Sequence, residues 1–478
     1  MILFQKFMTS HNTDSRKCLM SLKTITEEYR EKFISRTPKS AELYRRNVSL
    51  TPYGVHSNWR IFDPHPIFMA RGKGSRIWDV DGNEYIDYNM AFGALAIGHA
   101  HPILVERIRE RVENGTVFGF ETEYSVKLAE VLLKRFGFEM VRFSSTGLEG
   151  TQLAVRLARA ATNRPKILKF EGCYHGSHDS LLVGVKPDPL HAGHPKKPRS
   201  IPAGPGIPKD IADQVVIAPF NDIYAVEDIM RQHGNDIAAI ILEPIPMNMG
   251  VVLPKKGFLE GLRKLADEYN SLLIFDEVKT SGKFYKGAQD YFGVKPDIIV
   301  VAKALGGGYP FSAVMAKKEL MELIGPRKVA HGGTFNSNPL SVYAAYITVT
   351  EILTEQNLAY AQKLSDELAK GYRDVIEDKR VDAHVVNIAT SGTVFFTKEE
   401  ISNWRDFVSK VNWGRWYAWV LGMLVNGVIP QALGIDEQWT VSIQHTKEDI
   451  QKTIEIFDKV LSEIKGRETV PVKVEEAI

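Results

Sequence analysis

The chain has 478 residues, of which 44% are hydrophobic and 25% charged, a composition typical of a globular protein and not of a disordered or fibrous one. Its 60 basic and 58 acidic residues leave a net charge of +2, which excludes a broad electrostatic attraction to nucleic acid or to an anionic membrane. No apolar run approaches the ~20 residues that cross a bilayer, and the N-terminal segment lacks the apolar core of a signal peptide. We therefore expect a cytoplasmic protein whose two cysteines, Cys18 and Cys173, form no disulfide framework.

Residues 1–99 are predicted to form an N-terminal helix and an accessory segment that belong to a small domain. Apolar and charged residues are mixed at helical spacing over residues 22–36, which predicts an amphipathic helix. Further along, the pair Asp81-Gly82 lies within the alternating apolar and polar residues of 76–88, a pattern typical of a β-hairpin.

Residues 100–345 are predicted to form a large α/β domain, because short apolar runs alternate with helical stretches there. The runs are 167–170, 215–218, 238–242, 271–275, 298–301 and 312–315. Strands that are apolar on both faces indicate a mainly parallel sheet covered by helices on both sides. Residues 346–478 are predicted to form a C-terminal α+β domain, with a strand at 439–443, a helix that starts at Thr446 and a terminal tail.

Ionisable residues directly follow several of the predicted strands. Glu243, Asp276 and Lys303 each come at or just after a strand end, and Tyr174 and His175 lie in the loop after another strand. Ligands of parallel sheets bind outside the carboxyl ends of the strands, so we expect these side chains to meet at one binding edge.

Lys303 and Asp276 together fit the needs of pyridoxal 5'-phosphate. A lysine of lowered pKa forms a Schiff base with the cofactor's aldehyde, and a carboxylate keeps its ring nitrogen protonated. The glycines at 306–308 would leave room for a flat ligand. Alternatively, Lys303 extends from a strand end to solvent, and Asp276 caps a turn or pairs with Lys279.

A phosphate site is predicted at Ser144–Gly147, where hydroxyls and a glycine precede a helical stretch and its free N–H groups. The alternative is an ordinary N-cap. Tyr174 could stack on the cofactor ring or belong to the core. The histidines at 175 and 178 and at 99 and 101 lack the HExxH arrangement of a zinc site, so no metal is expected.

Four motifs resemble one known family: FDEV (275–278), AKALGGGYP (302–310), GCYHG (172–176) and HGGTFNSNP (331–339). Their ordered combination is similar to the class-III, fold-type I pyridoxal-phosphate aminotransferases, and most to the branch of glutamate-1-semialdehyde aminomutase. The similarity runs from about residue 52 to 465. It implies a mainly parallel seven-stranded sheet covered by helices, a smaller α+β domain from both ends of the chain, and a homodimer with shared sites.

The resemblance also implies roles for individual residues. Lys303 would hold the cofactor's aldehyde, Asp276 its ring nitrogen, and Tyr174 would stack on its ring. Thr146 and Gly147 would bind the phosphate, with Thr334 from the neighbouring subunit. The remaining implied contacts are Glu243 and Asn248 on the cofactor's other edge, Arg60 on the substrate carboxylate, and Glu437 and the aromatic Trp59 beside the substrate.

Departures from the aminomutase pattern concentrate in the substrate loop. The chain has VKPDP (185–189) where the aminomutases carry KAGSG, TGLEG (146–150) for SGTEA, and DEVKTSGK (276–283) for DEVMTGFR. On this ground we expect an aminotransferase that moves an amino group from an amine or amino acid to a keto acid such as pyruvate. Two alternatives remain on the same scaffold, glutamate-1-semialdehyde 2,1-aminomutase and an amino-acid racemase or epimerase. A non-catalytic binding protein would need neither Lys303 nor Asp276.

Overall fold

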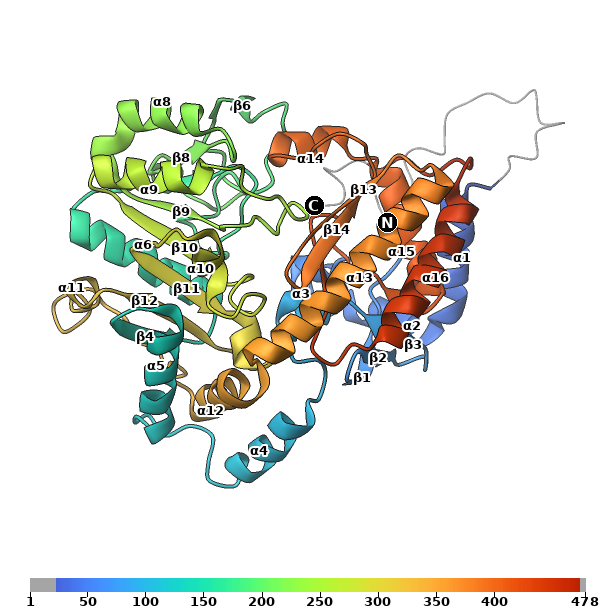
Figure 1. The fold of residues 1–478 in the computed structure, drawn as a ribbon, viewed down its shortest axis with the longest axis horizontal. Coiled ribbons are helices and arrows are strands. Elements are labelled where there is room, and N and C mark those ends of the chain that lie inside the picture. Colours follow the sequence, from blue (N-terminus) through green and yellow to red (C-terminus); the bar gives the residue numbers. More distant parts are fainter. Residues whose placement is uncertain (1–22, 473–478) are drawn as a thin grey trace.

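A seven-stranded sheet forms the centre of the larger part of the molecule, on the left in Figure 1. The computed structural model describes residues 23–472. The strand order is β4-β12-β11-β10-β9-β5-β8; the strands from β11 to β8 run parallel, and β12 is antiparallel to both of its neighbours. The strands are β4 (Met140–Ser144), β5 (Lys166–Phe170), β8 (Val215–Ala218), β9 (Ile237–Leu242), β10 (Leu272–Glu277), β11 (Ile298–Ala302) and β12 (Ser312–Ala316).

All six predicted apolar runs lie in strands of this sheet, and the prediction of a mainly parallel α/β fold is confirmed. The sequence did not indicate β4, because that strand lies at the sheet edge with Met140 and Arg142 exposed and so lacks a continuous apolar run.

The two faces of the sheet are covered by different helices, because successive side chains of a strand point to opposite faces. Ile298 and Val300 of β11 pack with α6 (Gly147–Thr162). Ile299 and Val301 pack on the other face with α5 (Glu123–Phe136) and α12 (Pro339–Ile347), and α8 (Ile223–His233) and α9 (Phe258–Glu268) continue this face. Burial on both faces explains the unbroken apolar runs.

The smaller part of the molecule is built from both ends of the chain, on the right in Figure 1. One sheet of this part has four strands: β1 (Met69–Lys73), β2 (Arg76–Asp79), β3 (Glu84–Asp87) and β15 (Val428–Ile429). A second sheet has three strands: β13 (His384–Ile388), β14 (Ser391–Phe395) and β16 (Trp439–Thr440). Its long helices are α1 (Ile25–Arg36), α13 (Glu355–Lys379), α15 (Trp413–Val425) and α16 (Lys447–Ile464). The predicted smaller α+β part is confirmed; the boundaries at residues 99 and 345 stay predictions.

Three local predictions in the smaller part are confirmed. Helix α1 lies within residues 22–36, and β2 and β3 pair antiparallel around the turn at Asp81-Gly82. Thr446 caps α16 in a reciprocal capping box with Asp449. The predicted strand at 439–443 is shorter than expected, since only Trp439–Thr440 pairs.

The other elements are short or peripheral. They are α2 (Pro38–Asn47), α3 (Met90–Gly93), α4 (Pro102–Val112), α7 (Lys209–Ala212), α10 (Gly287–Phe292), α11 (Lys318–Met321), α14 (Trp404–Lys410), β6 (Gly193–His194) and β7 (Lys197–Pro198). Within residues 23–472, no helix is both long and apolar enough to cross a membrane. The predictions about the N-terminal segment and Cys18, and the end of the predicted tail, lie outside the described residues.

Candidate active site

A cavity of about 460 Å³, here called the inner cavity, lies at the carboxyl edge of the central sheet. The strand register explains why: Leu242 of β9 lies opposite Phe275 of β10, which lies opposite Ile299 of β11, so the residues that follow meet at one edge. The polar and aromatic lining residues are Ser145, Thr146, Tyr174, His175, Glu243, Asn248, Asp276, Lys279, Lys303, Tyr309 and Phe311.

Lys303 begins the short 3₁₀ helix Lys303–Gly306, directly after β11. Its backbone φ is +48°, a left-handed conformation that is unusual for a lysine and typical of constrained functional positions. The Nζ atom donates to the carbonyl oxygen of Phe92 at 3.3 Å. Burial, and next the positive charge of Lys279, lower the pKa of Lys303 to about 8. A larger fraction of neutral amine makes this lysine a better nucleophile.

Asp276 is buried, and its two carboxylate oxygens have separate partners. Oδ2 lies 2.8 Å from Nδ1 of His175, and Oδ1 accepts from the backbone N–H of Val278 at 3.1 Å. The alternative in which Asp276 pairs with Lys279 is wrong, because Lys279 Nζ lies 2.8 Å from Oε2 of Glu437. Both bonds hold the Asp276 carboxylate in one orientation within the cavity.

Glu243 and Asn248 form one hydrogen-bonded unit. The amide of Asn248 donates to both carboxylate oxygens of Glu243, at 2.8 and 3.0 Å, and the backbone N–H groups of Tyr174 and Met247 donate to the same carboxylate. Burial raises the pKa of Glu243. Through the bond from Tyr174 N–H, Glu243 connects the loop that begins after β5 to the end of β9.

The start of α6 forms another wall of the inner cavity. Thr146 is the N-cap, and its hydroxyl accepts from the backbone N–H of Glu149. A Cβ at Gly147 would come within 2.8 Å of Val278, so the absence of a side chain lets the helix start approach the end of β10. Backbone N–H groups at a helix N-terminus favour an anion such as a phosphate.

A larger space of about 1210 Å³, here called the outer chamber, adjoins the inner cavity. Tyr174 lines both spaces, and the ring of Trp59 meets it edge-on at 5.4 Å. Phe92, whose carbonyl oxygen accepts from Lys303, and Glu437, which pairs with Lys279, also line the chamber. A molecule that reacts at Lys303 could therefore extend into the outer chamber.

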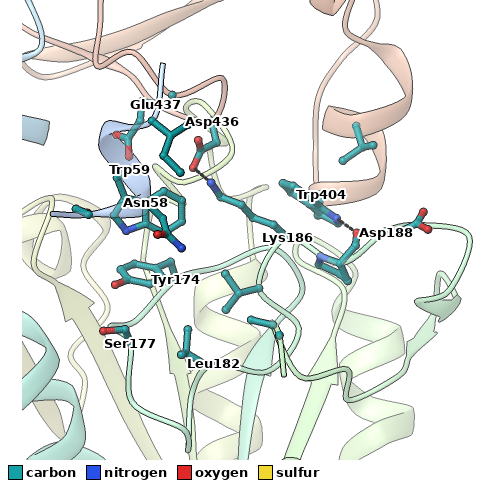
Figure 2. A pocket seen from close by; sticks show the side chains of 18 of the residues that line it. Asn58, Trp59, Tyr174, Ser177, Leu182, Lys186, Asp188, Trp404, Asp436 and Glu437 are labelled. Carbon is teal, nitrogen blue, oxygen red and sulfur yellow. Dashed lines mark hydrogen bonds and ion pairs between the residues drawn. The ribbon is translucent and has the colours of Figure 1, made fainter. Parts of the chain in front are cut away.

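Lys186 crosses the outer chamber between Trp59 and Trp404 (Figure 2). Its Nζ atom lies 2.7 Å from Oδ2 of Asp436 and 4.0 Å from the centre of the Trp59 ring. Both charged side chains of this ion pair are only 3% exposed. The pair joins the loop after β5 to a loop from the C-terminal segment.

Helix α14 fixes the same loop from the other side. Trp404 Nε1 donates to the carbonyl oxygen of Pro187 at 2.8 Å (Figure 2), and Arg405 donates to that of Pro189 at 2.9 Å. Arg405 also pairs through two nitrogens with Glu171, both at 2.8 Å. The loop that departs from the aminomutase pattern is therefore firmly anchored to the smaller part of the molecule.

Two residues with roles implied by the resemblance lie apart from both spaces. Arg60 is exposed and is not among the residues that line either space. Thr334 is exposed and lines a further hollow of about 480 Å³, which shares Ser145, Tyr309 and Pro310 with the inner cavity. Their roles stay predictions, and that of Thr334 would require a neighbouring subunit.

Other site residues were missed or only partly found in the sequence. His175 was placed at the correct edge without a role, and its bond to Asp276 depends on the course of the loop. Lys279, Lys186 and Asp436 had no sequence signal beyond their charge, because their partners lie 158 or more residues away.

The comparisons with known proteins agree with this geometry. Residues 60–461 match the family model described as aminotransferase class-III. The chain belongs to this family. It is 41% identical over 432 residues to glutamate-1-semialdehyde 2,1-aminomutase 1 of Macrococcus caseolyticus, covering 89% of this chain and 99% of that protein. The aminomutase of Archaeoglobus fulgidus is 40% identical, covering 88% and 99%.

Solved structures of class-III enzymes have the same fold. An omega-transaminase from Sphaerobacter thermophilus superposes with a TM-score of 0.86 at 30% identity, covering 91% of this chain and 100% of that one. A glutamate-1-semialdehyde aminomutase from Pseudomonas aeruginosa PAO1 gives a TM-score of 0.83 at 25% identity, covering 92% and 98%.

This class-III enzyme uses pyridoxal 5'-phosphate. The inner cavity fits that cofactor: it offers a lysine of lowered pKa, a carboxylate held by His175, a flat aromatic side chain and a helix N-terminus for the phosphate. These are the chemical groups that an aldehyde, a pyridine nitrogen, a ring and a phosphate require.

The expectation of an aminotransferase that passes an amino group to a keto acid such as pyruvate is contradicted by the relatives at about 40% identity, which are aminomutases. The expectation depended on substitutions in the loop 185–189. That loop lines the outer chamber, so its residues bear on which molecule binds. They do not determine whether the amino group passes to a second molecule or moves within one.

Proposed function

We propose that this class-III enzyme is an aminomutase that moves the amino group of glutamate-1-semialdehyde from carbon 2 to carbon 1. The observation that carries the proposal is the similarity of nearly the whole chain to enzymes of that name, at about 40% identity. Substrate and product are isomers: the product carries the amine on the former aldehyde carbon and a ketone at carbon 2. No keto acid is consumed.

Pyridoxal phosphate, when bound, withdraws electrons from the carbon that carries the substrate nitrogen. Lys303 Nζ would hold the cofactor's aldehyde until a substrate amine binds. As a free amine of lowered pKa, Lys303 then removes the proton from carbon 2 and returns protons during the reverse steps at carbon 1. Lys303 lines the inner cavity together with the other residues proposed to hold the cofactor.

The other inner-cavity residues hold the cofactor in place. Asp276, oriented by His175, would keep the ring nitrogen protonated. Tyr174 would cover one face of the ring, and Glu243 with Asn248 would line its edge. Thr146 and Gly147 would bind the phosphate with the N-terminus of α6. In the substrate region, Trp59 and Glu437 line the outer chamber, and Arg60 is the residue that the family resemblance assigns to the carboxylate.

The active unit that we propose is a cytoplasmic homodimer in which Thr334 of the partner subunit completes the phosphate site. Exposed apolar side chains near this part of the chain support an interface: Phe120 is 85% exposed and Phe335 is 62% exposed. Their segments adjoin, since Asn338 donates to the carbonyl oxygen of Thr116. Light scattering after size exclusion would test the dimer.

The reaction itself is tested by supplying glutamate-1-semialdehyde as the only substrate to the purified holoenzyme. We expect its amine-shifted isomer to form without any keto acid, and Lys303→Ala to abolish the conversion. Turnover that occurs only when pyruvate or another keto acid is added would overturn the proposal.

A further inference from the structure

We propose that Lys186 is the residue that binds the substrate's distal carboxylate, within the outer chamber. This inference rests on the proposed function, because it takes the substrate to carry a carboxylate away from the carbons that react. The amine end must reach Lys303 in the inner cavity, so a carboxylate three carbons from the amine-bearing carbon points toward the chamber that opens beyond Tyr174.

Lys186 is the one basic side chain among the described residues that line the outer chamber. The acidic lining residues are Asp179, Asp188, Asp436 and Glu437. Glu437 is neutralised by Lys279, and Asp188 accepts hydrogen bonds from His191 and the backbone N–H of Leu190. Asp179 is exposed. Asp436 is the ion-pair partner of Lys186 itself. Lys186 is therefore the one cation of the described lining that an incoming carboxylate can approach.

The ammonium of Lys186 is positioned to bind a substrate carboxylate in addition to the carboxylate of Asp436. It has three N–H donors, and its ion pair with Asp436 Oδ2, at 2.7 Å, leaves donors available for another acceptor. The ring of Trp59 lies 4.0 Å from Nζ and supports the charge from one side. Figure 2 shows the side chain extended across the chamber between these groups. Because the side chain is already ordered, binding a carboxylate costs little conformational entropy.

The backbone at Lys186 is constrained like that at Lys303. Within residues 23–472, Lys186 and Lys303 are the two lysines with positive φ, at +47° and +48°. Such conformations persist where the surroundings impose them, and they concentrate at ligand sites. At Lys186 the surroundings are Trp404 and Arg405, which bind the carbonyl oxygens of Pro187 and Pro189.

The competing cation, Arg60, lacks these features. It is exposed and does not line the outer chamber, although its neighbour Trp59 does. The geometry therefore favours Lys186, and the two residues can be separated by experiment.

The test uses 4-oxopentanoate, which has the ketone and carboxylate of the expected product without its amine, and the neutral 4-oxopentanamide. Calorimetric titration of the wild-type holoenzyme and of Lys186→Met gives the Kd of each. We expect Lys186→Met to weaken carboxylate binding roughly 10- to 100-fold, because a charge-assisted hydrogen bond is lost, and to leave the amide unchanged. Lys186→Arg should retain part of the preference for the carboxylate.

Two further variants keep the result interpretable. Lys186→Met leaves Asp436 buried without its partner, so the double variant Lys186→Met/Asp436→Asn should show the same loss of discrimination in a neutral chamber. Lys196→Met changes an exposed lysine of the same segment, outside both spaces, and should bind both ligands as the wild type does. A carboxylate Kd within twofold of wild type in both Lys186→Met and Lys186→Met/Asp436→Asn would overturn the inference. So would a loss of carboxylate binding seen in Arg60→Met instead.

This result is distinct from that of the activity assay. If the wild type fails to convert glutamate-1-semialdehyde while Lys186→Met still loses its discrimination, the proposed function fails and Lys186 remains a carboxylate site. If conversion occurs and discrimination is unaffected, only the assignment of Lys186 fails.

Discussion

The inner cavity and the outer chamber are built in different ways. The inner cavity takes its key residues from the ends of neighbouring strands, whose register places Glu243, Asp276 and Lys303 at one edge. The outer chamber is built from loops that are far apart in the chain, such as those of Lys186 and Asp436. The difference indicates that the sheet positions the residues proposed to act on the cofactor, whereas the loops determine which substrate can bind.

The largest effect should come from Lys303→Ala, which removes the amine that we propose holds the cofactor and moves the proton. We expect turnover to fall about 10,000-fold and the yellow Schiff base that borohydride reduces to be absent. Absorbance and activity measure both. The matched change Lys186→Ala in the outer chamber should keep the colour, and a coloured, active Lys303→Ala would remove the inner cavity from the mechanism.

The second largest effect is expected for Asp276→Asn, which removes the charge proposed to face the ring nitrogen while keeping the shape of the side chain. We expect turnover to fall roughly 100- to 1,000-fold with a much smaller change in substrate KM. His175→Gln should reproduce part of this loss, because His175 Nδ1 orients the carboxylate at 2.8 Å. Equal losses in kcat and in substrate affinity would place Asp276 on the substrate side instead.

Lys169→Met should destabilise the loop that carries Tyr174 into both spaces. Lys169 is fully buried in β5 and donates to the carbonyl oxygens of Cys173, Leu181 and Val183 at 2.8, 3.2 and 2.8 Å. Losing these bonds should lower the free energy of unfolding by about 3 kcal/mol, measured in denaturant.

The matched control for Lys169 is Lys166→Met in the same strand. Lys166 pairs with Asp236 at the surface, so its loss should cost less than about 1 kcal/mol. Equal effects of the two changes would show that the buried lysine does not support the loop.

The pH dependence of cofactor binding should report the environment of Lys303. Burial and the charge of Lys279 disfavour its ammonium form and lower the pKa to about 8. Because the neutral amine attacks the aldehyde, the rate of recombination with pyridoxal phosphate should rise about tenfold per pH unit below pH 8 and level off above it. Stopped-flow absorbance measures the rate.

Lys279→Met should move that plateau to higher pH, since it removes a positive charge and leaves Glu437 unpaired. A rate that continues to rise through pH 10 in the wild type would contradict the lowered pKa of Lys303.

The smallest effect is expected for Trp404→Phe, which removes one hydrogen bond to Pro187 and keeps most of the apolar surface. We expect the KM for the carboxylate substrate to rise about fivefold with kcat nearly unchanged. Trp413→Phe is the matched change in the same chamber, and its indole donates to Val408 instead of to the substrate loop. A larger effect of Trp413→Phe would mean that α14 does not position Lys186.

The sequence predicted the fold and the inner cavity well, because both depend on local patterns. Apolar runs predicted six of the seven strands of the central sheet, and the residues after four of the runs predicted the binding edge. The edge strand β4 was not predicted, because its exposed Met140 and Arg142 interrupt any apolar run. Asp276 and His175 were both placed at this edge, but the bond between them was not predicted, since that contact spans 101 residues.

The outer chamber could not be predicted in the same way. Lys186 followed by Pro187 forms no periodic pattern that would predict its position. Its ion-pair partner, Asp436, lies 250 residues further along the chain. The substitutions at 185–189 were noticed, and the reaction inferred from them was wrong, because a change in a binding loop carries no information about whether the amino group leaves the molecule.

The anchoring of the substrate loop to α14 has a consequence for the evolution of the enzyme. Trp404 and Arg405 hold residues 187–193 through backbone carbonyl oxygens, which every amino acid possesses. The hydrogen bonds from Trp404 and Arg405 therefore do not depend on which side chains stand at positions 187, 189 and 193, and the strands that carry Lys303 and Asp276 are not involved. Mutation and selection can retune substrate choice in this loop at little risk to the cofactor site.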